Sequence, residues 1–178
     1  FDESTTIAKQ IEKNLPTLEL TGWTEDSIKA YLTLNKLDPI EGIYKSYQSE
    51  GMPYYKFGII KSKDKFKAII IESDYKVWKA GEVKAYFEPS SMKGFYSVKW
   101  YRGNKVSEET FGMIKDDALL TIDFKDQKTG DKRQDQFIKM YPPSSGKVAV
   151  KKDGLQATGS GFFITTNGIV VTNAHVIE

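Results

Sequence analysis

Residues 83–124, VKAYFEPSSMKGFYSVKWYRGNKVSEETFGMIKDDALLTIDF, decide the fold class of this chain. Apolar and polar side chains alternate along three short runs within this stretch, as they do in β-strands that bury one side. The residues expected on the buried sides are Val83, Ala85 and Phe87, then Tyr96, Val98 and Trp100, then Leu120, Ile122 and Phe124. Lys84, Tyr86 and Glu88 are expected on the opposite, solvent-facing side of the first run. The pattern predicts consecutive strands.

The same rhythm extends over residues 37–142. Runs of β-forming residues are separated by short polar segments, such as Lys63-Asp64 and Asp116-Asp117, whose residue types favour turns. The predicted strands are 43–48, 54–61, 66–72, 83–88, 95–101, 105–115, 119–124 and 134–141. Antiparallel strands with short connections leave two exposed edges unless the sheet closes on itself. We therefore expect a mainly β fold, with an eight-stranded antiparallel barrel over residues 37–142.

Strand count and meander order make this region similar to the calycin superfamily, which includes the lipocalins and the fatty-acid-binding proteins. The resemblance covers about residues 37–142 and implies a barrel that takes up a small apolar molecule. The chain has ten Tyr, ten Phe and three Trp residues, whose rings either line such a cavity or fill the barrel. Because a small barrel leaves little room beyond its own side chains, we expect a filled barrel. Trp23, Trp78 and Trp100 are then core or rim residues.

Residues 1–36 are predicted to be helical and to brace the barrel. A first helix over 4–14 carries apolar residues at a helical spacing and is stopped by Pro16. A second helix begins with Thr24 as its N-cap. The apolar residues expected to pack are Ile7, Ile11 and Leu15 in the first helix and Ile28, Tyr31, Leu32 and Leu34 in the second. Short helices are marginal on their own, so both need a larger body to pack on.

A linker over 143–146 is predicted to lead into a second unit over 147–178. Prolines and small polar residues make this segment short and fairly stiff. Strands are expected in the second unit over 148–150, 161–165 and 169–172. Asn167-Gly168, between the last two, is the dipeptide that best tolerates a two-residue hairpin turn. Such a partial sheet leaves its strands unpaired, so we expect it to self-associate with a second chain or to fold against the barrel.

The sequence from the Asn-Gly turn through Thr172-Asn-Ala-His-Val resembles the start of a trypsin-like serine protease domain, closest to the HtrA type. By that resemblance His175, the only histidine of the chain, is the catalytic general base. An imidazole with a pKa near 6.5 suits the role, because it can take the proton of a serine hydroxyl and return it to the leaving amine. The resemblance implies a serine endopeptidase acting on peptide or protein substrates, in the periplasm, in the cell envelope or outside the cell.

The remainder of a catalytic triad is not expected within these 178 residues. In trypsin-like proteins the orienting acid and the nucleophilic serine follow the histidine, and three residues follow His175 here. Ser160 lies between two glycines, but a strand follows it, whereas the serine of a nucleophile elbow precedes a helix. We therefore interpret Ser160 as structural and expect this polypeptide to be catalytically incomplete, and inactive by itself.

Composition excludes several other function classes. The 26 basic and 24 acidic residues are thoroughly mixed, so no basic field indicates a nucleic-acid partner. No apolar stretch is long enough to span a membrane as a helix. The absence of cysteine excludes disulfides and thiolate ligands. The acidic pairs Glu108-Glu109 and Asp116-Asp117 lack a second ligand set at a metal-binding spacing, so neither a metal nor a cofactor is expected.

Three functions remain in view. The chain is the leading portion of a serine endopeptidase whose barrel recruits a substrate or a partner, or it is a carrier of a small hydrophobic molecule, or it is a non-catalytic interaction module. The TNAHV sequence around His175 favours the first of these.

Overall fold

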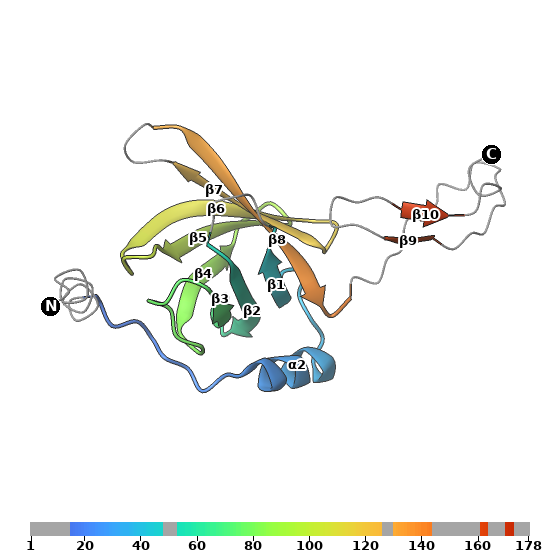
Figure 1. Ribbon diagram of the computed structural model, residues 1–178, viewed down its shortest axis with the longest axis horizontal. Coiled ribbons are helices and arrows are strands. Elements are labelled where there is room, and N and C mark those ends of the chain that lie inside the picture. Colours follow the sequence, from blue (N-terminus) through green and yellow to red (C-terminus); the bar gives the residue numbers. More distant parts are fainter. Residues whose placement is uncertain (1–14, 48–52, 126–129, 144–160, 164–169, 173–178) are drawn as a thin grey trace, which may run out of the picture. The chain divides into compact units, whose positions relative to one another are not determined.

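The computed structural model describes residues 15–47, 53–125, 130–143, 161–163 and 170–172 (Figure 1). The chain divides into two compact units, residues 1–144 and 145–178. The helix expected over 4–14 and the strand expected over 148–150 lie outside the described residues, as do Ser160 and His175.

The first unit contains a closed barrel of eight antiparallel strands, each paired with its neighbours in chain order (Figure 1). The strands are β1 (Gly42–Ser46), β2 (Tyr55–Ser62), β3 (Lys65–Ser73), β4 (Val83–Pro89), β5 (Phe95–Tyr101), β6 (Ser107–Lys115), β7 (Leu119–Lys125) and β8 (Lys132–Tyr141). Pairing of β8 with β1 completes the circle and removes the open edges of the sheet. The mainly β fold and the closed barrel are confirmed, and the barrel is compatible with a calycin-like fold.

Inward-facing rings fill the middle of the barrel. Phe57 is completely buried, and its ring lies 5.0 Å from that of Phe137 and 6.1 Å from that of Trp100. Val83, which was also predicted to face inward, is buried but does not belong to this core, because it precedes an irregularity in β4 and pairs with Ile69. The other inward-facing residues predicted from the alternation of β4, β5 and β7 belong to the same core. They are Ala85, Phe87, Tyr96, Val98, Leu120, Ile122 and Phe124. The period of two in these strands is therefore what builds the interior.

A helix, α2 (Glu25–Leu34), packs on the outside of the barrel. Its N-terminus is closed by a capping box, in which the backbone N–H groups and side chains of Thr24 and Ser27 pair reciprocally. One helix face is buried against outward-facing isoleucines of β1, β2 and β3. The predicted N-cap and the burial of Ile28 and Leu32 are confirmed. The prediction that Leu34 packs is wrong: this residue projects from another side of the helix and is 83% exposed.

A buried carboxylate ties the helix to the barrel. Glu41 is only 1% exposed. It accepts a hydrogen bond of 2.6 Å from the hydroxyl of Tyr31 on α2 and one of 2.9 Å from the backbone N–H of Lys61 on β2. It also accepts from the backbone N–H of Asp38, at 2.8 Å. Burial, and then the hydrogen bond to Glu41, raise the pKa of Tyr31 to about 12, so this phenol stays protonated and continues to donate.

The second unit contains an antiparallel hairpin of β9 (Gly161–Phe163) and β10 (Val170–Thr172). Both strands fall within the ranges predicted for them. Phe163 pairs with Val170, whereas a two-residue turn at Asn167-Gly168 would pair Phe163 with Thr172. The observed register therefore differs by two residues from the one that this turn predicts.

Candidate functional site

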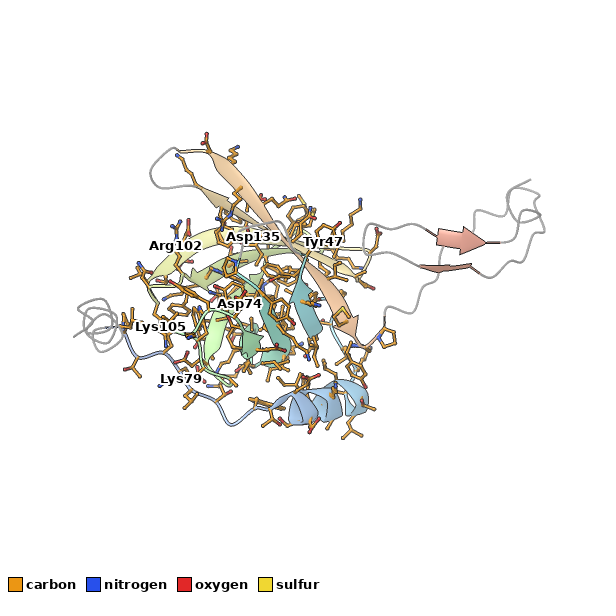
Figure 2. The ribbon with its side chains drawn as sticks, viewed as in Figure 1. Tyr47, Asp74, Lys79, Arg102, Lys105 and Asp135 are labelled. Carbon is orange, nitrogen blue, oxygen red and sulfur yellow. The ribbon has the colours of Figure 1, made fainter. Side chains whose placement is uncertain are left out.

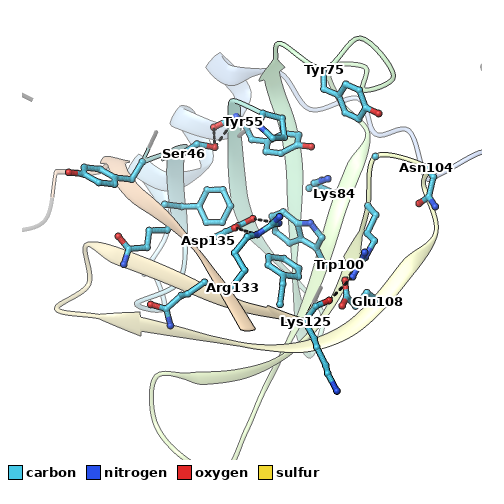
Figure 3. Close-up of a pocket in the computed structure, with 18 of the residues that line it drawn as sticks. Ser46, Tyr55, Tyr75, Lys84, Trp100, Asn104, Glu108, Lys125, Arg133 and Asp135 are labelled. Atoms are coloured by element: carbon cyan, nitrogen blue, oxygen red, sulfur yellow. Dashed lines mark hydrogen bonds and ion pairs between the residues drawn. The ribbon is translucent and has the colours of Figure 1, made fainter. Parts of the chain in front are cut away.

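A pocket of about 1330 Å³ opens at one end of the barrel (Figure 3). It lies where β1, β5 and β7 end and where β2, β4, β6 and β8 begin. Asp74, Arg102 and Asp135, which are among its lining residues, are labelled in Figure 2. The pocket is thus framed by residues that are far apart in sequence and that the closed sheet brings together.

Aromatic rings form the floor of this pocket. Trp100, Phe124 and Phe137 line it, and the ring of Trp100 lies 5.7 Å from each of the other two. These separations are typical of well-packed aromatic pairs, so the three rings hold one another in place. The expectation of a filled barrel is therefore only half correct, because the rings fill the middle and leave a cavity above themselves.

Lys84 reaches the pocket through an irregularity in β4. Ala68 pairs with Ala85 and Ile69 pairs with Val83, which leaves Lys84 as an extra, unpaired residue. Such a β-bulge interrupts the alternation of side chains. The prediction that Lys84 lies on the solvent-facing side is wrong for this reason. Lys84 is 1% exposed and lines the pocket, beside Trp100 in Figure 3.

The amine of Lys84 is surrounded by aromatic rings. Its Nζ lies 3.9 Å from the ring centroid of Trp78, 4.4 Å from that of Tyr55 and 4.9 Å from that of Trp100. It donates one hydrogen bond of 2.6 Å to the carbonyl oxygen of Tyr101. Among the described residues it has no ion-pair partner. The rings would attract an ammonium, but they do not replace the lost hydration.

Burial consequently lowers the pKa of Lys84 well below its ordinary value of 10.5, and the negative charge of Asp135 opposes this only in part. The same environment acts on the phenol beside it. Burial raises the pKa of Tyr55 to about 12. The wall of the pocket thus favours uncharged forms of both groups. The Trp78 indole N–H is buried without a hydrogen-bond partner among the described residues.

A second buried lysine nearby has a different environment. Lys105 is 7% exposed, and its Nζ lies 5.5 Å from the ring centroid of Trp78. It forms an ion pair of 2.7 Å with Glu82, whose side chain is 8% exposed. Glu82 in turn accepts a hydrogen bond of 3.0 Å from the backbone N–H of Lys79. The charge of Lys105 is therefore compensated, and Lys105 is not among the residues that line the pocket.

Paired charges surround the mouth of the pocket. Arg133 donates two hydrogen bonds, of 2.8 and 3.2 Å, to the carboxylate of Asp135, and Arg102 donates one of 2.5 Å to Glu108. Burial raises the pKa of Asp135, and the charge of Arg133 partly offsets that effect. Because positive and negative groups alternate here, the mouth selects no single sign of charge strongly.

A tyrosine lies at the mouth of the pocket. Tyr75 follows β3 and packs against Gly103, which belongs to the turn between β5 and β6. A Cβ atom at residue 103 would overlap the Tyr75 ring, so the glycine is what permits this close approach. This contact joins the β3–β4 connection to the β5–β6 turn at one side of the mouth.

None of the pocket residues was assigned a function from the sequence, and the one residue that was, His175, lies outside the described residues. The alternation in β4 predicts that Lys84 faces solvent, because a single sequence does not reveal where a β-bulge interrupts the alternation. Among the described residues, no group of three or more His, Cys, Asp or Glu side chains could hold a metal ion. No helix in the described part of the chain is long and apolar enough to cross a bilayer.

Comparison with known proteins gave no significant match among family models, curated proteins or solved structures.

Proposed function

We propose that the barrel is a binding domain for a small, planar and largely apolar molecule, which enters the pocket and stacks on its aromatic floor. The single observation that carries this proposal is the pocket of about 1330 Å³ above Trp100, Phe124 and Phe137. Pockets for small molecules are typically a few hundred to a thousand cubic ångströms, largely apolar, with a few polar groups that orient the ligand. This pocket is somewhat larger and more polar: Lys84 and Tyr55 lie in its wall above the aromatic floor, and charged side chains such as Arg133 and Asp135 surround its mouth.

The proposal is tested with N-phenyl-1-naphthylamine, a neutral planar probe whose fluorescence rises in apolar sites. We expect saturable binding with one probe per barrel. Asp135→Phe adds a ring within the pocket and removes a half-buried carboxylate, so it is expected to weaken binding at least about tenfold. The barrel is expected to stay folded, because Arg133, which loses its partner, is 54% exposed and stays solvated. Circular dichroism checks the fold of the variant.

Glu72→Phe is the matched control. Glu72 is exposed on β3 and is not among the pocket residues, so this variant adds the same ring on the outside of the barrel. Its affinity for the probe is expected to equal that of the unsubstituted protein. Absence of saturable binding, or equal affinity of Asp135→Phe and the unsubstituted protein, would contradict the proposed pocket function.

We also propose that the second unit belongs to a trypsin-like serine endopeptidase domain, with His175 as its general base, in a protein of the periplasm, the cell envelope or the extracellular space. This proposal is supported by the antiparallel β9–β10 hairpin, whose second strand ends at Thr172, the first residue of the sequence Thr172-Asn-Ala-His-Val. On this proposal the barrel brings the ligand, or a substrate that carries it, to the protease.

A fluorophosphonate probe tests the protease proposal, because it reacts with serines activated by a neighbouring base. The intact protein that contains this chain is expected to be labelled and to cleave peptides. His175→Ala is expected to reduce turnover on the order of 10⁴-fold or more. Lys147→Ala, in the same unit, is the control and should leave turnover unchanged. Labelling that is absent, or that persists in His175→Ala, would contradict this role.

A further inference from the structure

The two buried lysines of the barrel differ in what they can do chemically. Lys105 forms an ion pair of 2.7 Å with the Glu82 carboxylate, so its Nζ already has a charged partner. Lys84 has a backbone carbonyl as its hydrogen-bond acceptor and three ring faces around it. Of these two lysines, Lys84 is the one that lines the pocket.

An uncharged amine fits the contacts of Lys84. A neutral amine can donate the one hydrogen bond that Tyr101 accepts and still keep a free lone pair. The ring faces would attract an ammonium, but no carboxylate among the described residues forms an ion pair with Lys84 to compensate its buried charge. Burial also lowers the pKa of this side chain, which increases the fraction of free amine at neutral pH. A desolvated lysine in an apolar pocket is the usual form of an amine nucleophile in proteins.

We propose that Lys84 is a covalent attachment site, at which its amine condenses with a planar aromatic or conjugated aldehyde bound in the pocket. This inference rests on the proposed function of the pocket as a binding site for planar apolar molecules. The flat floor formed by Trp100, Phe124 and Phe137 accommodates the body of such a molecule, while its carbonyl carbon faces the amine.

The condensation involves no oxidation or reduction. The lone pair of Nζ attacks the carbonyl carbon, the C–N bond forms, and the carbonyl oxygen becomes the hydroxyl of a carbinolamine. The C–O bond then breaks as the imine forms, and the oxygen leaves as water with the two protons of the amine. Because the product is an imine in equilibrium with the free aldehyde, attachment is reversible by hydrolysis.

The test uses 2-naphthaldehyde and sodium cyanoborohydride, which reduces the imine to a stable secondary amine. The protein is incubated at pH 7, and modified residues are located by peptide mapping with mass spectrometry. We expect Lys84 to be modified at least about tenfold faster than any other lysine, since each unit by which the pKa falls gives tenfold more free amine. Lys105 serves as an internal control within the same molecule and is expected to remain unmodified.

Two further measurements separate this inference from the pocket function on which it rests. Lys84→Met is expected to lose the rapid phase of modification, while slow modification of exposed lysines continues. The alcohol 2-naphthalenemethanol cannot form an imine, and it is expected to displace N-phenyl-1-naphthylamine from the unsubstituted protein. Displacement by the alcohol without preferential modification of Lys84 would overturn the covalent site and leave the pocket function standing. Failure of the alcohol to displace the probe would count against both.

Discussion

Lys84 is the residue at which burial and charge conflict most directly. Its side chain is almost completely enclosed, with aromatic rings and one carbonyl oxygen as its neighbours. Taking an ammonium out of water is unfavourable unless an opposite charge replaces the lost hydration. The protein therefore holds this side chain at the expense of stability, a pattern that is common at functional sites and unusual in a purely structural core.

Replacing Lys84 by methionine is expected to be neutral or stabilising at pH 7, by up to about 4 kcal/mol in the free energy of unfolding. Methionine has a similar length and carries no charge, so it fills the same space without the desolvation penalty. Urea denaturation followed by tryptophan fluorescence measures the difference. A loss of more than about 1 kcal/mol, the scale of one hydrogen bond, would contradict this account of Lys84.

The pH dependence of that difference has a definite sign. Burial lowers the pKa of Lys84 in the folded state below 10.5, its value in the unfolded chain. Between the two values the unfolded chain binds more protons, so the unsubstituted protein loses stability as the pH falls, by at most about 1.4 kcal/mol per pH unit. Lys84→Met does not titrate there. Its advantage over the unsubstituted protein is therefore expected to be larger at pH 7 than at pH 10.

Lys105→Met is the matched control, and it is expected to behave in the opposite way. It removes the partner of the buried Glu82 carboxylate and leaves an uncompensated charge. Breaking a buried ion pair in this way costs about 3–5 kcal/mol. Equal effects of the two substitutions would mean that the ion pair does not distinguish the two lysines.

At the scale of elements, the helix and the barrel are joined by a close approach at one glycine. A Cβ atom on Gly58 of β2 would lie 2.8 Å from both Cδ1 and Cγ2 of Ile28, which is closer than carbon atoms pack. Ile28 is completely buried in the contact between α2 and the barrel. The absence of a side chain at Gly58 therefore sets how closely α2 lies on the sheet.

Gly58→Ala alone is expected to destabilise the protein by about 1–3 kcal/mol through overpacking, and Ile28→Ala alone by about 2–5 kcal/mol through loss of buried contacts. The double variant is expected to be more stable than the sum of the two effects, by about 1 kcal/mol or more, because the shortened side chain makes room for the new methyl group. Urea denaturation of all four proteins gives this coupling. Gly22→Ala, whose Cβ would meet no atom within 4 Å, is the control and should combine additively with Ile28→Ala.

At the scale of the whole molecule, the fold follows from the sequence more completely than the site does. All eight strands of the barrel were predicted within a few residues, because inward and outward side chains alternate visibly along β5 and β7. Closure followed from the need to remove sheet edges, and pairing of β1 with β8 confirms it. Both inferences use properties that each strand carries by itself.

The sequence left open whether the rings line a cavity or fill the barrel, and the polar lining of the pocket could not be predicted, because it depends on how the strands pair. Lys84 enters the interior through the way β4 pairs with β3, and the sequence of β4 alone suggests that it faces solvent. Leu34 shows the same limit on α2, since apolar character does not reveal which side of a short helix meets the barrel. The register of β4 on β3 places Lys84, and the packing of α2 on the barrel places Leu34. No local pattern in a single sequence reveals either arrangement.

The division into two compact units leads to a prediction for the complete chain. His175→Ala is expected to change the free energy of unfolding of the barrel by less than about 0.5 kcal/mol, because we expect each compact unit to unfold independently. All three tryptophans, at positions 23, 78 and 100, belong to the first unit, so tryptophan fluorescence reports on that unit selectively. Phe57→Ala is the positive control, with an expected loss of about 3–5 kcal/mol because its ring lies at the centre of the core. A comparable loss in His175→Ala would mean that the barrel and the second unit fold as one body, and ligand binding and proteolysis could then not be assigned to separate parts of the chain.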